Sequence, residues 1–450
     1  MSINETIKSN KKTLFYIFIA ALLLRVFFFL TVSLVLDVNL EQDFEYGIIA
    51  RSLIAGEGYS VPWREEPSAQ EPLVPWLEEP GAQEPLKVPH NYRSSAYHLP
   101  LYPIMLAAIY YFVKSTFSTF IIISIQILLS SATCFLIYLI ALKLFINQRA
   151  AIIAGGIMIF YPTFIIHVAR IIPETILIFW LSLTVLYLLR QKDNPSYRNS
   201  LVTGSLIGIA LLTSNVIAPM MPFIVAWLLI SLTIPWKKRV KIIILTMLTA
   251  FIVVSPWLVR NYIVFKEFPL MKTTMGHNLW LGNSPKSTGT FYSQSGGITM
   301  ASILQKDFLE GQKLSELEQD KRLYYKAIAH IKKEPMHFAG LFLKRLYYFI
   351  WFAPDNLVSK EARLNNKVSK LPYGLILISC IIGVILSLRK YPKDVFLIFS
   401  IILSVTLIYS VFIVGHPRYR MTIEPYMILF SAYAICVILD KIPVHYFKRR

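Results

Sequence analysis

The segment from Asp37 to Tyr59, DVNLEQDFEYGIIARSLIAGEGY, directly follows the first long apolar run of the chain. It therefore fixes where the first membrane helix ends and on which side the polar loops begin. Acidic residues gather at its start, and from Phe44 to Leu53 the apolar side chains recur at helical spacing. This pattern predicts a short amphipathic helix on the membrane surface, with acids near its N-terminus, where the backbone dipole favours them.

The composition is that of a membrane protein. The chain has 450 residues, of which 55% are hydrophobic and only 16% charged, against roughly 25% charged in soluble proteins. We therefore predict an all-α polytopic membrane protein with the lipid bilayer as a partner. The formal net charge of +19 does not call for nucleic acid, because basic residues cluster at the ends of apolar segments, as the positive-inside rule and anionic headgroups explain.

The order of apolar and polar stretches predicts the organisation of the chain. We expect, in order, a cytoplasmic N-terminus (1–12), a first transmembrane helix (13–36), an outer-face loop (37–98), a transmembrane core (99–258), a second outer-face loop (259–337), further membrane segments (338–440) and a basic cytoplasmic tail (441–450). The first outer-face loop and the Arg190–Arg198 loop, which is expected to be cytoplasmic, must be joined by an odd number of crossings, but four apolar runs lie between them. We therefore expect one run to be short, re-entrant or fused with its neighbour, and we place a broken helix around Pro162 and Pro173. The run at 338–352 carries two basic residues, which are costly at the bilayer centre, and is expected to be interfacial.

A tandem duplication interrupts the first loop. WREEPSAQEPLVP begins at Trp63 and WLEEPGAQEPLKVP at Trp76. Pro, Glu and Gln dominate both copies, so residues 63–89 are expected to form an extended or disordered insert and not a folded repeat array.

The outer face collects acids together with several arginines. This mixture suits a phosphorylated ligand, because guanidinium groups bind phosphate oxygens while an acid handles a proton. Simpler roles stay open: Arg170 and Glu174 are four residues apart and would also pair along a helix, and Arg260 would also serve as a headgroup anchor. No cofactor is expected, and the histidines lack zinc-site spacing; a divalent cation on Asp43 and Glu45 is left open.

Six motifs then occur in a characteristic order: DFEYGIIARSLIAGEGYS, SAYHLPLYPIMLA, ARIIPETILIF, SPWLVRNYIVFKEFPL, GHNLWLGNSPKSTG and RYRMTIEPY. In this order the chain resembles the polytopic polyprenyl-phosphate-sugar-dependent glycosyltransferases with the GT-C fold, in particular bacterial members of family 39, related to protein O-mannosyltransferases and lipid A aminoarabinose transferases. The resemblance implies a helical bundle of about 10–13 membrane segments, with two large outer-face loops that carry short interfacial helices.

The resemblance also implies roles for individual residues. Asp43 would be the catalytic carboxylate; Glu41 and Glu45 are alternatives, because Gln42 holds the place where the acid of relatives often lies. Glu174 matches a second family acid. The carrier phosphate and donor would be bound by Arg260, Arg418, Arg420, Arg170, Tyr46, Tyr97, His98, Asn278 and Asn283. Where relatives often show Arg-Pro, this chain has Ser214 and Asn215, so one basic contact is missing or supplied elsewhere.

The expected function is transfer of a sugar, with inversion, from a polyprenyl-phosphate-linked donor to an acceptor glycan, lipid or protein. The active site would lie on the extracytoplasmic face of the plasma (inner) membrane. Two other classes stay open: a glycan polymerase or ligase that uses diphosphate-linked chains, and a lipid-linked sugar transporter or flippase. The absence of an inverted internal repeat speaks against the transporter.

Overall fold

The computed structural model describes residues 10–35, 44–63, 91–113, 117–269, 271–292, 314–358, 360–412 and 417–441. The first half of this part contains α2 (Lys11–Val35), α3 (Phe44–Ile54), β1 (Ser60–Trp63), β2 (Asn91–Ser94), α4 (Leu101–Phe112), α5 (Phe117–Phe145), α6 (Gln148–Phe160), α7 (Pro162–His167), α8 (Glu174–Asp193) and α9 (Tyr197–Thr213). The second half contains η2 (Asn215–Met220), α10 (Met221–Ser231), α11 (Trp236–Phe265), α12 (Met275–Asn283), α14 (Glu316–Lys333), α15 (Pro335–Ile350), η3 (Asp355–Leu357), α16 (Lys360–Leu388), α17 (Pro392–Val411), η4 (Pro417–Thr422) and α18 (Glu424–Lys441).

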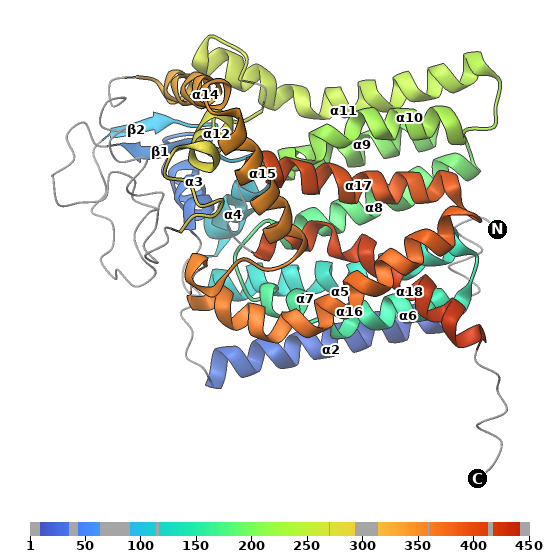
Figure 1. Ribbon diagram of the computed structural model, residues 1–450. Coiled ribbons are helices and arrows are strands. Elements are labelled where there is room, and N and C mark those ends of the chain that lie inside the picture. The colour runs from blue at the N-terminus through green and yellow to red at the C-terminus, as the bar shows by residue number, and fades with distance from the viewer. Residues whose placement is uncertain are drawn as a thin grey trace.

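Long helices form a bundle, and the short elements gather at one end of it. Figure 1 shows α3, α12, α14 and the two strands at this end, which we call the loop end, while α15 runs across the bundle. The start of α2 and the end of α18 lie at the opposite end (Figure 1). Within the bundle α11 packs on α9, α16 on α18, and α5 on α2, α6 and α8.

Helices of membrane-spanning length confirm the predicted all-α polytopic class. In the described part of the chain, six helices are long and apolar enough to cross a bilayer: Lys11–Thr31, Phe117–Phe145, Glu174–Asp193, Trp236–Phe265, Arg363–Leu388 and Pro392–Val411. Three shorter apolar helices accompany them: Leu101–Phe112, Gln148–Phe160 and Asn215–Ser231. α11 and α16 extend beyond the apolar runs of the sequence, because helical backbone bonding continues where the side chains turn polar.

The predicted break in the core is present. α6 ends at Phe160, Pro162 opens the short helix α7, and Pro173 is the N-cap of α8. A proline lacks the N–H that a continuous helix requires but fits its first turn, so each proline begins a new segment. Glu174 thereby becomes the first residue of a membrane helix.

Two short strands at the loop end were not predicted from the sequence. β1 and β2 pair antiparallel, from Ser60 opposite Ser94 to Trp63 opposite Asn91. Each has only four residues, β1 contains a proline, and the tandem duplication separates them, so neither shows a strand pattern alone. Residues 64–90, which hold nearly all of the predicted insert, lie outside the described part of the chain.

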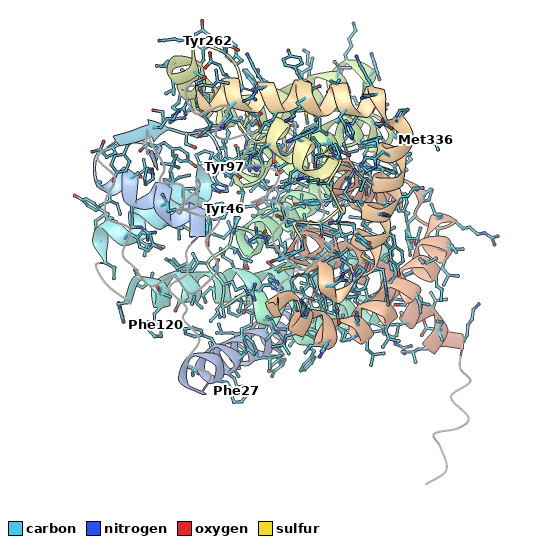
Figure 2. All side chains as sticks on the ribbon, turned by 60° about the vertical axis from the view of Figure 1, so that its left-hand side comes forward. Phe27, Tyr46, Tyr97, Phe120, Tyr262 and Met336 are labelled. Carbon is cyan, nitrogen blue, oxygen red and sulfur yellow. The ribbon has the colours of Figure 1, made fainter. Side chains whose placement is uncertain are left out.

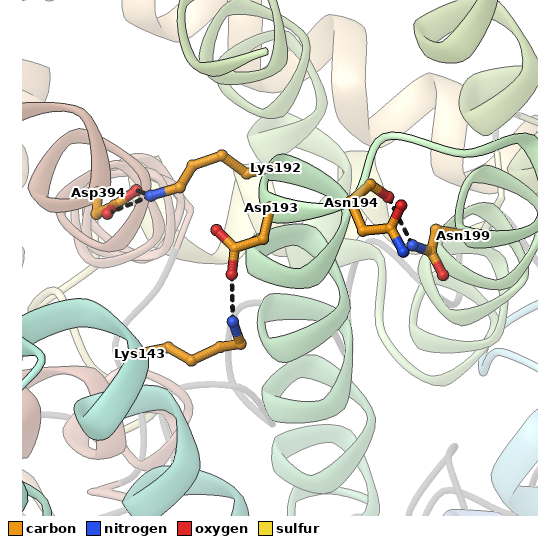
Figure 3. A network of polar contacts seen from close by, with 6 residues as sticks. All are labelled: Lys143, Lys192, Asp193, Asn194, Asn199 and Asp394. Atoms are coloured by element: carbon orange, nitrogen blue, oxygen red, sulfur yellow. Dashed lines mark hydrogen bonds and ion pairs between the residues drawn. The ribbon is translucent and has the colours of Figure 1, made fainter. Parts of the chain in front are cut away.

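Ion pairs tie the helices together at the end of the bundle opposite the loops. Lys192 of α8 donates to both carboxylate oxygens of Asp394 in α17, at 2.8 and 2.6 Å. The neighbouring Asp193 pairs with Lys143 of α5 (Figure 3). Asn199 then donates to the backbone carbonyl of Asn194, at 2.7 Å, and closes the turn from α8 into α9. The last turn of α8 is therefore held to α17 and to α5.

The strand register gives a first prediction. Because Trp63 and Asn91 face each other across the hairpin, residues 64–90 can be replaced by the two-residue turn Asn-Gly, which suits a tight hairpin. Shortening the loop lowers its closure entropy and should stabilise the hairpin by up to about 2 kcal/mol. We expect an unchanged or higher melting temperature for the purified protein. A melting temperature several degrees lower would show that the insert contributes contacts to the fold.

Candidate functional site

Helix α3 carries one side of the site. Its residues Ile49 and Ala50 are fully buried, and the helix packs on α4, which follows the hairpin. It ends before Gly56 and Gly58, both with positive φ of 84° and 70°, a backbone region that glycine adopts without steric cost. The predicted base Asp43, its alternative Glu41 and the side chain of Glu45 lie outside the described part of the chain.

Aromatic rings from both outer loops meet beside α3. The ring of Tyr46 lies 4.1 Å from that of His98 and 5.3 Å from that of Tyr102. Tyr97 contacts His98 at 5.0 Å and reaches His277 of α12 at 5.9 Å. Figure 2 shows Tyr46 and Tyr97 close to each other at the loop end. Three predicted site residues are thus brought together, and His277 joins them.

A carboxylate and a guanidinium from distant parts of the chain also meet here. Arg418 Nε lies 3.4 Å from Glu174 Oε1, with side-chain exposures of 28% and 10%. Burial disfavours the charge on Arg418, but Glu174, Tyr419 and Tyr46 outweigh it, so the pKa of Arg418 is raised and the group stays cationic. Tyr46 of α3 is therefore close enough to contribute to the electrostatics of the Arg418–Glu174 pair. The other oxygen of Glu174, Oε2, has no hydrogen-bond partner among the described residues.

Arg420 is engaged in a buried cage. Its Nε donates to Glu424 at 2.9 Å and its Nη1 to the carbonyl of Trp351 at 2.7 Å. The guanidinium carbon lies 3.6 Å from the ring of Tyr373 and 4.2 Å from that of Phe352. These contacts hold η4 against the end of α15 and against α16, and they engage the Nε and Nη1 donors of Arg420.

Arg260 is similarly engaged with the first outer loop. Its guanidinium donates to the carbonyls of Ser95, at 2.7 Å, and Tyr59, at 2.6 Å. It also lies over the rings of Tyr59 and Trp257. The side chain therefore joins the end of α11 to the base of the hairpin, a contact that its motif alone did not predict.

The remaining predicted residues occupy different surroundings. Arg170 is half-buried, and its carbonyl accepts a hydrogen bond from Gln126 at 2.7 Å. Asn278 is half-buried on α12. Asn283 is buried and donates to the carbonyl of Val411 at 3.1 Å, so it holds the end of α17. Among the described residues, no three His, Cys, Asp or Glu side chains gather where a metal ion would bind.

The motif GHNLWLGN forms α12, and its two glycines are points of close approach. A Cβ atom on Gly276 would lie 1.8 Å from the carbonyl oxygen of Asp320, and one on Gly282 would lie 1.5 Å from that of Phe412. Asp320 also accepts the backbone N–H of His277 at 2.9 Å and so caps the first turn of α12. The glycines let α12 pack directly on α14 and on the end of α17.

A half-buried acid joins the two outer loops. Glu316, the first residue of α14, accepts from the backbone N–H of Ala96 at 2.8 Å and from the hydroxyl of Thr273. Thr273 in turn donates its backbone N–H to the carbonyl of Ala96 at 3.1 Å. Burial raises the pKa of Glu316. Tyr97 and His98, which follow Ala96, are thereby held beside α12.

The comparisons with known proteins can be set against this geometry. Residues 97–259 match the family described as dolichyl-phosphate-mannose-protein mannosyltransferase; this segment includes His98 and Glu174 and ends just before Arg260. Among solved structures, the Archaeoglobus fulgidus oligosaccharyltransferase in complex with Zn and sulfate has a TM-score of 0.55 at 12% identity, over 94% of this chain and 49% of that one. The oligosaccharyltransferase AglB of the same organism, in complex with an inhibitory peptide and a dolichol-phosphate, has a TM-score of 0.52 at 13% identity, over 96% and 51%.

The chain has the GT-C fold. The resemblance to GT-C glycosyltransferases that the sequence predicted is confirmed. ArnT from Cupriavidus metallidurans bound to undecaprenyl phosphate also matches, over 91% of this chain and 77% of that one at 13% identity, but its TM-score of 0.38 is too low to support an argument. No curated protein matches the sequence. The chain spans about half the length of the two oligosaccharyltransferases.

The close approach of α12 gives a second prediction. Gly282→Ala places a methyl group against the carbonyl of Phe412, so α12 must move away from α17, at a cost of about 1–3 kcal/mol. We expect a clearly lower melting temperature. The control is Gly340→Ala in α15, whose added Cβ meets nothing within 4 Å; it should be neutral or stabilising by up to about 1 kcal/mol. Equal effects of the two substitutions would contradict the packing role of Gly282.

Proposed function

We propose that this chain is a membrane glycosyltransferase that moves a sugar from a polyprenyl-phosphate-linked donor to an acceptor on the outer face. The observation that carries the proposal is the Arg418–Glu174 pair beside Tyr46. It brings a fixed cation from the C-terminal RYR motif next to the helix that directly follows Asp43. A cation and a general base on opposite sides of one reacting carbon are what such a transfer requires.

Arg418 is the best candidate for the carrier phosphate. It keeps its charge, and its side chain is more exposed than that of Arg420. The side chain of Arg420 is only 5% exposed, and both Arg260 and Arg420 fasten segments of the loop end through backbone carbonyls. We therefore assign phosphate binding first to Arg418, with Arg170 as a second candidate.

In the proposed reaction the acceptor hydroxyl attacks the anomeric carbon as the bond to the carrier phosphate breaks. Asp43 takes the hydroxyl proton, with Glu45 as the alternative base, and the sugar is transferred with inversion. The leaving polyprenyl phosphate is a weak base and needs no general acid. Arg418 stabilises the negative charge that develops on it, and Glu174 keeps the guanidinium in place.

The aromatic rings suit the sugar. Tyr46, Tyr97 and His98 form an edge with apolar ring faces and polar tips, which can cover the C–H face of a hexose or pentose and still donate hydrogen bonds. Asn278 on α12 is the amide of the predicted set that is only half-buried. A lipid phosphate in the AglB structure supports, by fold analogy, a polyprenyl phosphate as the carrier.

The test is a third prediction. Purified protein is incubated with defined sugars linked to polyprenyl monophosphate or diphosphate, and consumption of each donor is followed. We expect the monophosphate to be consumed. Asp43→Asn should lower the rate by about 10² to 10⁴, the usual contribution of a general base, and Arg418→Gln should weaken donor binding.

The matched control is Glu57→Gln, which removes an exposed carboxylate from the turn after α3. It should retain the full rate. Near-normal transfer by Asp43→Asn would exclude Asp43 as the base. Consumption of only the diphosphate-linked donor would replace the proposal with a polymerase or ligase.

A further inference from the structure

Helix α15 contacts the RYR segment and its surroundings at three successive points. The first is Arg345, whose side chain is completely buried. Its guanidinium donates to the carbonyls of Ser410, at 2.6 Å, and Val411, at 3.2 Å. These are among the last carbonyls of α17, which lack partners inside the helix. Arg345 therefore caps the C-terminus of α17, the helix that leads to Arg418.

The same guanidinium also binds α12. It donates to Asn283 Oδ1 at 2.8 Å and to the carbonyl of Gly282. These partners of Arg345 are all neutral oxygens, and burial lowers its pKa to about 10. Burying a cation without a carboxylate is costly. An apolar side chain would be less costly to bury if α15 needed only packing at this position. The position therefore requires the several N–H donors of the Arg345 guanidinium.

The second contact is a column of aromatic rings. Phe349 lies one turn after Arg345 and stacks on Tyr409 of α17, with centroids 5.4 Å apart and planes at 16°. The ring of Tyr409 stacks in turn on Tyr419, at 4.7 Å and 17°. Tyr419 lies next to Arg418, whose guanidinium carbon is 5.3 Å from the ring. The column therefore runs from α15 to the neighbour of the cation.

The third contact is at the end of α15. The carbonyl of Trp351 accepts from Arg420 at 2.7 Å, and the carbonyl of Ile350 accepts from Tyr373 at 2.7 Å. One helix thus holds the chain before the RYR motif, at the end of α17, and within the motif, at Arg420. This support reaches the pair from the Arg418 side.

We propose that Arg345 is a positioning residue for Arg418: by fixing the end of α17, it keeps the Arg418 guanidinium beside Glu174 and open to the carrier phosphate. This inference rests on the proposed function only for the identity of the ligand. The positioning itself is a statement about the Arg418–Glu174 pair, and it can be tested without ligand.

A second buried arginine provides the control. Arg25 in α2 is also completely buried, and it likewise donates to neutral partners: Ser130 Oγ at 2.7 Å, the carbonyls of Ala21 and Met158, and Cys134 Sγ. It joins α2 to α5 and α6, whereas Arg345 joins α15 to α12 and α17. Arg25→Lys should therefore cost stability in the same way as Arg345→Lys, with no effect on Arg418.

The ligand-free experiment is a thermal double-mutant cycle. Glu174→Gln is introduced into wild type, Arg345→Lys and Arg25→Lys, and melting temperatures are compared. Glu174→Gln should shift the melting temperature less than half as much in the Arg345→Lys background as in wild type. In the Arg25→Lys background the shift should equal that in wild type. Equal shifts in all three backgrounds would overturn the proposal. If Arg345→Lys does not fold, Phe349→Leu takes its place, since it interrupts the ring column.

The second experiment measures binding of farnesyl phosphate to the same purified proteins. Arg345→Lys should raise Kd about tenfold, the order expected for loss of one charged hydrogen bond, while Arg25→Lys stays near wild type. Combined with Arg418→Gln, Arg345→Lys should add no further loss, because it acts through Arg418. Additive losses, or wild-type affinity in Arg345→Lys, would overturn the positioning role. If wild type itself does not bind the probe, the proposed function fails, and the thermal cycle still decides the role of Arg345.

Discussion

A single ion pair between Arg418 and Glu174 organises the loop end of this protein. The two residues are far apart in the sequence, and a half-buried guanidinium at 3.4 Å from a carboxylate requires both partners to be held in place. Glu174 is fixed because Pro173 begins α8 immediately before it. Arg418 is fixed from the other side, through the capped end of α17 and the stacked rings of Tyr409 and Tyr419.

The outer loops are joined to each other and to the bundle by close backbone approaches and by buried or half-buried polar side chains. α12 lies against α14 at Gly276 and against α17 at Gly282, where no side chain would fit. Glu316 joins the first loop to the second at Ala96 and Thr273, and Arg260 joins the first loop to α11. Through these contacts the rings of Tyr97 and His98 are held beside Tyr46, which itself lies near Arg418.

The sequence predicted the helices, and which motifs lie together, far better than it predicted the role of each residue. Apolar length and the prolines at 162 and 173 were sufficient for the membrane helices and the break, because both effects are local. The motif order correctly indicated a GT-C fold, and Tyr46, Tyr97 and His98 do lie together. Motifs alone could not separate Arg418, which is partly exposed beside Glu174, from Arg420, which is buried, and from Arg260, which is bound to the carbonyls of the first outer loop. That difference depends on tertiary contacts with the hairpin and with Trp351.

Arg345 is a residue whose structural role could not be predicted from the sequence. In the sequence it is a basic residue that interrupts an apolar run. Because a charged side chain is costly at the bilayer centre, this feature suggests only an interfacial helix. Its partners are backbone carbonyls of two other helices, which carry no signature in the sequence. The two strands escaped prediction for a related reason, since each is defined only by its partner across the tandem duplication.

The most direct test of the account is a structure of the protein in a lipid nanodisc with a polyprenyl monophosphate bound. The account predicts that the phosphate lies within hydrogen-bonding distance of the Arg418 guanidinium, at the loop end and on the same side as Asp43. A phosphate bound at the opposite end of the bundle, near Lys192 and Asp394, would contradict it.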